Sequence, residues 1–314
     1  MIYPSPLRPG DTVALISPAT TVKEEYVHGA AEQMSRLGLR PLVMPHALGP
    51  VHGSYAANLS SRLQDITDAL TLPEVKAIFC TRGGYGCVHL LGHIPLDLLR
   101  EHPKHLIGFS DVSALHALWQ KAGIISLHAP MARHLTHFPS VGDEGGGKPA
   151  YCTEKLFELL RSPRPAVDYS LPTSPLSLRG KATGRLTGGN LAVLSHLTGT
   201  PYDPLAPLPG EELILFIEDI GEAIYATERM LWQLKLSGAL ARYKGIVAGQ
   251  FTGNKPDRNF PSTSAMIASR LREWGVTCPV AIDFPAGHVD FNLPLPLGAQ
   301  VTLEVSGGET LLRV

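Results

Sequence analysis

The most constraining feature of the sequence is a regular alternation of short apolar runs with amphipathic segments over residues 1–140. The apolar runs are "TVALIS" (12–17), "RPLVM" (40–44), "VKAIFC" (75–80), "HLIGF" (105–109) and "IISLHAP" (124–130). Helical patterns over residues 22–37 and 59–70 separate the first three of them. Strands that alternate with helices indicate βαβ units, and they therefore predict an α/β domain with a mostly parallel sheet and helices on both faces.

The composition changes after residue 140. The stretch "VGDEGGGKP" (141–149) is rich in glycine and charge, and "SPRPAVDYSLPTSP" (162–175) is rich in proline, so we expect a connector over residues 141–179. A short helical pattern over residues 150–160 lies between these two stretches. Residues 180–314 contain the strand pattern "LILFIEDIGE", the helix pattern "ATERMLWQLKLSG" and a proline-rich end. A chain of 314 residues is long enough for two domains, and we expect the second over residues 180–314.

Composition and charge exclude several classes of protein. A net charge of −1 without a basic run argues against nucleic acid as a partner, and 44% hydrophobic residues are typical of a globular protein. The first residues resemble neither a signal peptide nor a membrane anchor, so we expect a cytoplasmic protein without a membrane partner. Because none of the four cysteines forms a C-x-x-C pair, we expect no disulfide framework, no metal site and no cofactor.

The stretch "LIGFSDVSALH" (106–116) contains a candidate nucleophile. Ser110 lies between a strand pattern and a helix pattern, which is the order found in a nucleophile elbow. The second glycine of Gly-x-Ser-x-Gly is absent, because Val112 occupies that position. Ser110 is therefore either a nucleophile or a helix N-cap that acts with Asp111. His116 follows on the same predicted helix, points elsewhere and cannot act as its base.

The stretch "CTRGGYGC" (80–87) follows another predicted strand. Its glycines, Gly83, Gly84 and Gly86, are spaced too closely for a dinucleotide-binding motif. Glycines at a strand end form a tight turn, or they let backbone N–H groups approach an anion. The second interpretation makes this stretch an oxyanion donor at the same sheet edge as Ser110, where ligands of open α/β sheets bind.

Acidic residues and a histidine in the second half could complete a catalytic site. Glu218 and Asp219 end a buried strand pattern, and Glu222 lies just beyond. Such acids can orient an imidazole or cap the following helix, and Glu218 follows the apolar run directly, so we expect it to be held most rigidly. His288 follows Gly287 in a loop after the strand pattern "PVAID", where it is free to face a cleft.

Six motifs in order resemble the LD-carboxypeptidase family of serine peptidases, which includes muramoyltetrapeptide carboxypeptidases and microcin C self-immunity hydrolases. They are "RPGDTVALISPAT", "TRGGYG", "IGFSDVSALH", "GRLTGGNLAVLSHLTGTPYDP", "LFIEDIGE" and "GHVDFNLPLPLG". The resemblance covers residues 7–300. It implies a flavodoxin-like N-terminal domain and a smaller β-rich α+β C-terminal domain, with the active site in the cleft between them, and a homodimer.

The resemblance also implies the roles of individual residues. The implied triad is Ser110, Glu218 and His288, with Asn292 present in the histidine motif. The implied oxyanion hole uses the backbone N–H of Asp111 and of a glycine of the R-G-G-Y-G turn. We assign that glycine as Gly84, with Gly83 and Gly86 as alternatives. His288 would take the proton of Ser110, and an acyl-enzyme would follow.

The implied substrate is murein tetrapeptide, from which peptidoglycan-recycling members release the terminal D-alanine. A carboxypeptidase must also hold the free carboxylate of its substrate, and an arginine suits that role. Arg82 and Arg229 are the candidates, although no pattern in the sequence assigns either of them to the cleft.

Two alternatives remain. A microcin-type hydrolase that cleaves an aminoacyl-adenylate analogue would need an aromatic platform for a purine. Trp119 and Trp232 are at core-like helical positions, Trp274 is at a helix end, and none lies in the expected connector. The other alternative is a non-enzymatic ligand-binding protein with two lobes, in which the three triad residues need not converge.

Overall fold

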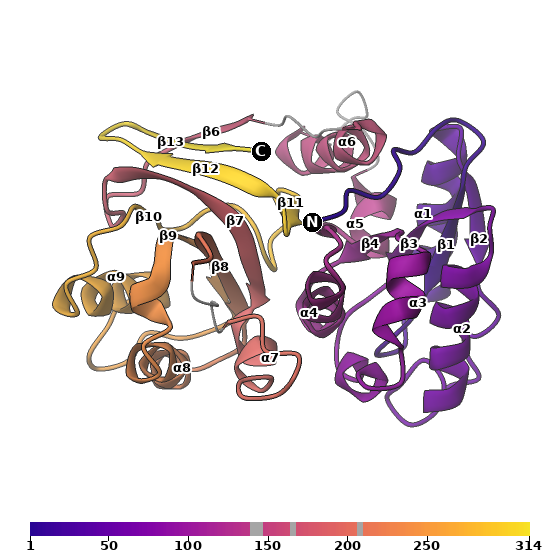
Figure 1. Ribbon diagram of the computed structural model, residues 1–314, viewed down its shortest axis with the longest axis horizontal. Coiled ribbons are helices and arrows are strands. Elements are labelled where there is room, and N and C mark those ends of the chain that lie inside the picture. The colour runs from indigo at the N-terminus through magenta and orange to yellow at the C-terminus, as the bar shows by residue number, and fades with distance from the viewer. Residues whose placement is uncertain (139–146, 164–167, 206–209) are drawn as a thin grey trace. The chain divides into compact units, whose positions relative to one another are not determined.

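The computed structural model describes residues 1–138, 147–163, 168–205 and 210–314, and the chain divides into two units (Figure 1). Unit 1 consists of Met1–Pro165 and Asp290–Pro296, and unit 2 of Ala166–Val289 and Leu297–Val314. Each unit has its own sheet. Residues 141–146 and 164–167 of the expected connector lie outside the described residues.

The sheet of unit 1 has the order β11-β5-β4-β3-β1-β2. Its strands are β1 (Thr12–Ile16), β2 (Arg40–Val43), β3 (Val75–Cys80), β4 (His105–Gly108), β5 (Ser126–His128) and β11 (Leu295–Leu297). The pairs β1–β2, β1–β3, β3–β4 and β4–β5 are all parallel. The expectation of a mostly parallel α/β domain is therefore confirmed, and the apolar runs found in the sequence form its strands.

The helices of unit 1 are buried to different degrees. They are α1 (Glu24–Arg36), α2 (Leu59–Thr71), η1 (Cys87–Leu90), α3 (Leu96–Glu101), η2 (Ser110–Val112), α4 (Ser113–Ala122), α5 (Ala132–His137) and α6 (Gly147–Arg161). In α1 the buried side chains Val27, Ala30 and Met34 recur at helical spacing. The Asn58 side chain caps α2 by accepting a hydrogen bond from Ser61 N at 2.9 Å.

Helix α6 lies inside the range 141–179 that we expected to be a connector, but it belongs to unit 1. It buries Ala150, Leu156, Phe157 and Leu160. This apolar face is the physical reason for the difference, because a connector exposed to solvent would not bury four such side chains.

The sheet of unit 2 has the order β10-β9-β8-β7-β12-β13-β6, and it is parallel from β7 to β10 and antiparallel elsewhere. Its strands are β6 (Asp168–Pro172), β7 (Gly180–Asn190), β8 (Leu213–Ile220), β9 (Tyr243–Thr252), β10 (Val280–Ala281), β12 (Gln300–Val305) and β13 (Glu309–Arg313). Its helices are α7 (Leu191–Ser195), α8 (Ile224–Leu236), η3 (Leu240–Arg242) and α9 (Thr263–Glu273). The expected β-rich α+β domain is therefore confirmed.

The glycine pair of "LTGGN" lies inside a strand and not in a turn. Strand β7 continues through Gly188 and Gly189 to Asn190. Gly188 has φ 132°, and a Cβ atom there would lie 1.7 Å from the carbonyl oxygen of Phe216 on β8. The glycine is needed because the two strands approach closely at this point.

Candidate active site

Ser110 begins the short helix η2 directly beyond the carboxyl end of β4, and it is half-buried. Its φ is 65°, a left-handed conformation that is uncommon for a residue other than glycine. The residue at the N-cap of η2 is Phe109 and that of α4 is Val112, and neither cap has a side-chain hydrogen bond. Ser110 is therefore not an N-cap. Its strained backbone on a strand-to-helix turn is instead the geometry of a nucleophile elbow.

The glycine-rich turn after β3 lies against Ser110. A Cβ atom on Gly83 would lie 2.9 Å from Ser110 Cβ and 3.2 Å from Asp111 N. Gly84, with φ 110°, faces Thr20 instead. Thr20 N donates to the carbonyl oxygen of Gly83 at 3.3 Å, and Tyr85 N donates to Thr20 Oγ1 at 2.9 Å. The turn is thus fixed on both sides of Gly84.

Two buried charged side chains hold this turn through hydrogen bonds to its backbone. Arg62 is buried, and its Nη1 donates to the carbonyl oxygens of Pro18 at 2.6 Å and Gly86 at 3.0 Å. The carboxylate of Asp111, also buried, accepts a hydrogen bond from Cys87 N at 2.8 Å. Asp111 therefore links the nucleophile turn to the glycine-rich turn through its side chain. Sequence reasoning missed this role, because no pattern shows which backbone N–H a carboxylate will meet.

Glu218 and His288 come together in unit 2. Glu218 is fully buried near the end of β8, and its Oε2 lies 2.7 Å from Nδ1 of His288. A neutral His288 donates the Nδ1 proton to this carboxylate, which leaves Nε2 as a proton acceptor. The His288 side chain is 14% exposed, so the ring retains an accessible edge. A serine nucleophile requires a base and an acid that orients it, and a hydrogen-bonded imidazole and carboxylate have the chemistry for these two roles.

Two glycines make room for the buried carboxylate. A Cβ atom on Gly287 would lie 2.7 Å from Glu218 Oε2, and one on Gly249 would lie 3.2 Å from Glu218 Cβ. The pairing of β8 with β9 shifts register between Ile217 and Asp219, directly at Glu218. Such irregularities re-aim a side chain next to a functional site.

Asp219 has a structural role that differs from that of its neighbour. Its carboxylate accepts hydrogen bonds from Asn190 Nδ2 at 3.0 Å and from Ala192 N at 2.8 Å at the start of α7. Burial raises the pKa of Asp219 to about 6. Glu218 thus contacts an imidazole, as one of the two interpretations of these acids suggested. Asp219 binds the start of α7, which precedes β8, and does not cap the helix that follows.

The sequence indicated that His116 cannot act as a base for Ser110, and the contacts of its ring agree with this. Its ring nitrogens lie 2.8 Å from Ser126 Oγ and 2.8 Å from the carbonyl oxygen of Gly108. It is fully buried, and burial lowers its pKa to about 3. His116 therefore supports the backbone immediately before the Ser110 turn.

The two candidate carboxylate-binding arginines lie in different surroundings. Arg82 is exposed in unit 1 next to Gly83, and its Nη1 donates to the carbonyl oxygen of Thr21 at 2.8 Å. Arg229 is exposed in unit 2 on α8, where its guanidinium lies 5.0 Å from the ring centre of Tyr225.

The tryptophans differ in part from the expectation. Trp119 is in the core, and its Nε1 donates to the carbonyl oxygen of Lys104 at 3.0 Å. Trp232, expected at a core-like position, is 37% exposed on α8. It packs edge-on against Trp274 at the end of α9, with ring centres 4.9 Å apart. The two rings meet because α8 and α9 are neighbours in unit 2.

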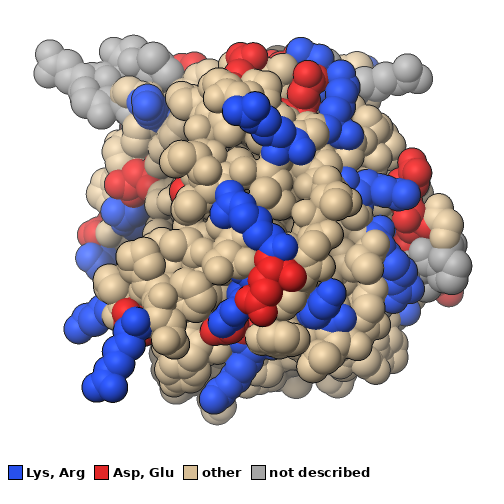
Figure 2. Space-filling view, turned by 90° about the vertical axis from the view of Figure 1, so that its left-hand side faces the viewer, with Lys and Arg blue, Asp and Glu red and all other residues tan. Residues whose placement is uncertain are grey.

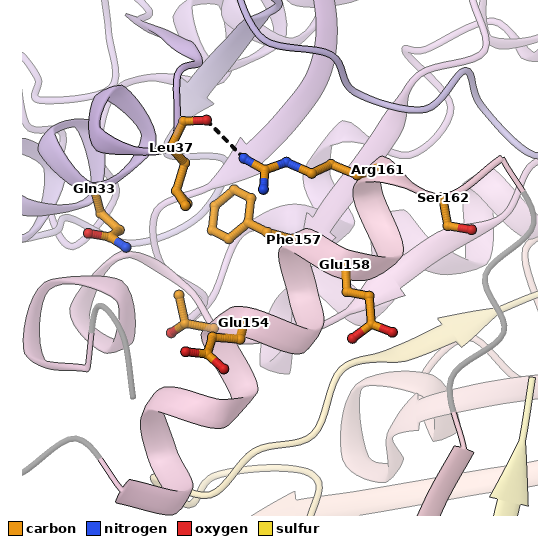
Figure 3. Close-up of a pocket in the computed structure, with 8 residues that line it drawn as sticks. Gln33, Leu37, Glu154, Phe157, Glu158, Arg161 and Ser162 are labelled. Atoms are coloured by element: carbon orange, nitrogen blue, oxygen red, sulfur yellow. Dashed lines mark hydrogen bonds between the residues drawn. The ribbon is translucent and has the colours of Figure 1, made fainter. Parts of the chain in front are cut away.

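A pocket elsewhere in unit 1 contains none of the predicted site residues. It has a volume of about 530 Å³ and lies between α1 and α6, with Leu37, Phe157 and Arg161 among its lining residues (Figure 3). Arg161 Nη2 closes one side by donating to the carbonyl oxygen of Leu37 at 2.8 Å. This pocket is therefore separate from the Ser110 turn.

Three other features of the described residues bear on function: surface charge, potential metal ligands and the hydropathy of the helices. On the face that Figure 2 displays, basic side chains are spread singly and several stand next to acidic ones. Across the described ranges, no three histidine, cysteine, aspartate or glutamate residues are grouped to hold a metal ion. In the part of the chain that the structure describes, no helix is long and apolar enough to cross a membrane.

Comparisons with known proteins agree with the motifs. The family model for the LD-carboxypeptidase N-terminal domain matches residues 13–129, and that for the C-terminal domain matches residues 183–303. The murein tetrapeptide carboxypeptidase of Pseudomonas aeruginosa is 31% identical over 93% of this chain and 92% of its own length. The microcin C7 self-immunity protein of Escherichia coli is 27% identical over 96% of this chain and 92% of its own length.

A solved structure agrees as well. The muramoyltetrapeptide carboxypeptidase of Oxalobacter formigenes superimposes with a TM-score of 0.82 at 30% identity, and the match covers 96% of this chain and 98% of that one. The serine turn, the acid–histidine pair and both matched domains lead to one conclusion: the chain belongs to the LD-carboxypeptidase family of serine peptidases.

Proposed function

We propose that this protein is an LD-carboxypeptidase that releases the terminal D-alanine from murein tetrapeptide during peptidoglycan recycling. The hydrogen bond of 2.7 Å between His288 and the fully buried Glu218 is the observation that carries the proposal. A buried carboxylate that fixes an imidazole is what a serine hydrolase needs, and the left-handed backbone of Ser110 supports the same assignment.

In the proposed mechanism, Ser110, Glu218 and His288 act as a triad. His288 Nε2 takes the hydroxyl proton as Ser110 attacks the carbonyl carbon, and Glu218 stabilises the imidazolium that forms. His288 then donates that proton to the nitrogen of the leaving D-alanine. Water then takes the place of the amine. His288 accepts a proton from water as the water oxygen attacks the acyl carbon, and it returns this proton to Ser110 Oγ as the ester bond breaks.

The proposed oxyanion hole consists of the N–H groups of Asp111 and Gly84. The N–H of Asp111 belongs to the first turn of η2, where helix geometry leaves N–H groups without intrahelical acceptors. The carbonyl of Gly83 points to Thr20 N, and in a trans peptide the N–H of Gly84 points the opposite way. Tyr85 N–H is already used by Thr20 Oγ1, which makes it unsuitable.

Of the two arginines, we favour Arg82 for the substrate's terminal carboxylate. Arg82 directly precedes Gly83 in the sequence, and Gly83 lies against Ser110. Arg229 belongs to unit 2, where it stacks on Tyr225. A guanidinium can bind a carboxylate through two parallel hydrogen bonds.

The test is release of D-alanine from murein tetrapeptide, measured by chiral chromatography for the wild type, Ser110→Ala and Glu218→Gln. We expect Ser110→Ala to lose several powers of ten in kcat. We expect Glu218→Gln to lose about 10⁴-fold, because the amide cannot fix the productive tautomer of His288.

Two controls make the result specific. Ser35→Ala, which changes an exposed serine on α1, should leave the rate unchanged. Murein pentapeptide ends in a D-alanyl-D-alanine bond and should remain intact, because the proposed enzyme cleaves after an L-centre. Release by wild type and Ser110→Ala alike, or by neither, would contradict the proposal.

We also propose that the protein is a homodimer and that it acts in the cytoplasm. Tyr225, Trp232 and Leu236 are exposed along one face of α8, at spacings of seven and four residues, which supports a protein interface there. The four cysteines are free, which suits a reducing compartment. Light scattering after size exclusion tests the dimer, and cell fractionation tests the location.

A further inference from the structure

An aromatic cluster lies beside the glycine-rich turn and has no role in the proposed triad. We name Tyr55, Tyr85 and His89 the aromatic platform. The Tyr85 ring lies 6.0 Å from that of Tyr55 and 5.2 Å from that of His89, and Tyr55 and His89 are 5.4 Å apart, all between ring centres. Tyr85 is nevertheless 55% exposed, so one of its faces is open to a ligand.

Neighbouring side chains fix the rings of the aromatic platform in place. The guanidinium of buried Arg62 stacks on the Tyr55 ring at 5.0 Å and hydrogen-bonds the carbonyl oxygen of Gly86. The backbone N–H of Tyr85 is fixed by Thr20 Oγ1, and its hydroxyl lies 3.3 Å from His89 Nε2. An exposed aromatic ring with so many fixed contacts is pre-organised, which reduces the entropy that binding would cost.

The aromatic platform is close to the nucleophile. Gly83 contacts Ser110, and Tyr85 is two residues further along the same turn, so its Cα lies within about 7 Å of Gly83. A substrate whose carbonyl carbon reaches Ser110 carries a side chain on the adjoining carbon. At this separation we infer that the substrate side chain, and not a sugar three residues away, meets the Tyr85 ring.

The chemistry of the aromatic platform favours one kind of side chain. The open face of a tyrosine packs against methylene groups and attracts a cation through its ring electrons. The guanidinium of Arg62 stacks on the Tyr55 ring, and the Tyr85 ring remains 55% exposed. An aliphatic chain with an ammonium group at its end meets both properties, as in lysine, or in diaminopimelate, where the same terminal carbon also carries a carboxylate.

We propose that the aromatic platform is the subsite for the side chain of the residue that supplies the scissile carbonyl, and that Tyr85 selects a long aliphatic side chain with a terminal ammonium group. This inference rests on the proposed carboxypeptidase function. Tyr85 is a specificity residue in this proposal, because its ring contacts substrate without taking part in proton transfer.

The test uses four tetrapeptides with diaminopimelate, lysine, norleucine or alanine at the third position. Norleucine keeps the aliphatic stem of lysine and removes its charge. KM and kcat are measured for the wild type, Tyr85→Phe and Tyr85→Ala, with thermal unfolding to verify folding. The matched control is Tyr3→Ala: Tyr3 is 40% exposed and follows Ile2, which pairs with Ile124 at the amino-terminal side of the sheet, opposite Ser110.

We expect Tyr85→Ala to raise KM on the order of tenfold for the diaminopimelate and lysine peptides, with kcat retained. The increase should be smaller for norleucine and absent for alanine. Tyr85→Phe and Tyr3→Ala should match the wild type. An equal loss for all four peptides, a loss confined to kcat, or no loss would overturn the proposal.

A second measurement separates this inference from the proposed function. Dissociation constants of the same peptides are measured by calorimetry with Ser110→Ala and with Ser110→Ala combined with Tyr85→Ala. If the wild type releases no D-alanine, the proposed function fails. The dissociation constants then still test whether the aromatic platform binds the side chain of the third residue. Tighter binding of lysine than of norleucine that disappears with Tyr85→Ala supports it. Peptides that fail to bind, or that bind alike in both variants, overturn it.

Discussion

At the scale of single residues, Gly287 carries a strict requirement. Its φ is 127°, and a Cβ atom there would lie 2.7 Å from Glu218 Oε2, the atom that accepts from His288. We expect Gly287→Ala to displace the carboxylate and to lower kcat by at least tenfold, because loss of the Glu218 contact disorders the imidazole. D-alanine release measures the effect.

A second glycine separates this clash from ordinary backbone strain. Gly275 has φ 69°, but nothing lies within 4 Å of the position that a Cβ atom would take. Gly275→Ala should therefore cost about 1 kcal/mol of stability and leave kcat unchanged. Equal losses of kcat in both variants would show that the contact with Glu218 is unimportant.

Asp111 gives another prediction at this scale, through its side chain. Asp111→Ala removes the acceptor of Cys87 N–H and leaves that buried donor unpaired, so we expect a loss of about 1–3 kcal/mol in the free energy of unfolding. Chemical denaturation measures it. Asp111→Asn keeps a side-chain oxygen and should lose less, and a greater loss with Asn than with Ala would contradict this explanation.

At the scale of elements, strand β8 carries two acids with different partners. One of them, Asp219, makes the stability of the folded state depend on pH. Burial raises the pKa of Asp219 to about 6, above its ordinary value near 4. The folded state therefore retains a proton that the unfolded chain has lost. The stability that this proton contributes is complete below pH 4 and is lost as the pH rises through about 6.

The prediction is a difference between two denaturation series. Between pH 4 and pH 7, wild type should lose up to about 3 kcal/mol relative to Asp219→Asn, whose amide does not titrate. Parallel curves over this range would mean that Asp219 titrates near its ordinary pKa. The comparison with Asn removes the contribution of all other titrating groups.

The elements also show how far the sequence leads. The strands β1, β3 and β4 were predictable because apolar residues dominate each of them, and α1 because Val27, Ala30 and Met34 repeat at helical spacing. Gly188 could not be read as part of a strand, since its reason is the backbone of β8, which is distant in sequence. The short helices η1 and η2 were missed because three or four residues carry no periodicity.

The candidate site was predictable to the same degree. Glu218 and His288 were identifiable as residue types at strand ends, and their pairing is now observed. The backbone of Ser110 was not predictable, because nothing in "GFSD" alone requires a positive φ. The aromatic platform was hidden for another reason: Tyr55 and Tyr85 are 30 positions apart, and only the fold brings their rings together.

At the scale of the whole molecule, unit 1 is assembled from two stretches of chain. Strand β11 lies beside β5 at the end of its sheet, and the segment Asp290–Pro296 buries Asn292, Leu293 and Leu295. Without this segment, β5 becomes an unpaired edge and the sites of these side chains are empty. We expect residues 1–165 alone to unfold at a lower temperature than residues 1–165 fused by a glycine-serine linker to residues 290–297.

A single substitution in the complete protein provides the control for that comparison. Leu295 is fully buried, and Leu295→Ala should cost about 2–5 kcal/mol. The same substitution should also lower the melting temperature of the fused form, measured by circular dichroism. If the fused and unfused forms melt together, the returning segment contributes nothing to unit 1.

The divided origin of unit 1 also bears on how such chains can be recombined. A single crossover near residue 165 would combine Met1–Pro165 of one parent with Asp290–Pro296 of another, so that β5 and β11 would come from different ancestors. Only a double exchange keeps the two stretches together. Chimeras built to transfer the Ser110 turn should therefore carry residues 290–296 with it, and we expect inheritance of these stretches to be coupled across the family.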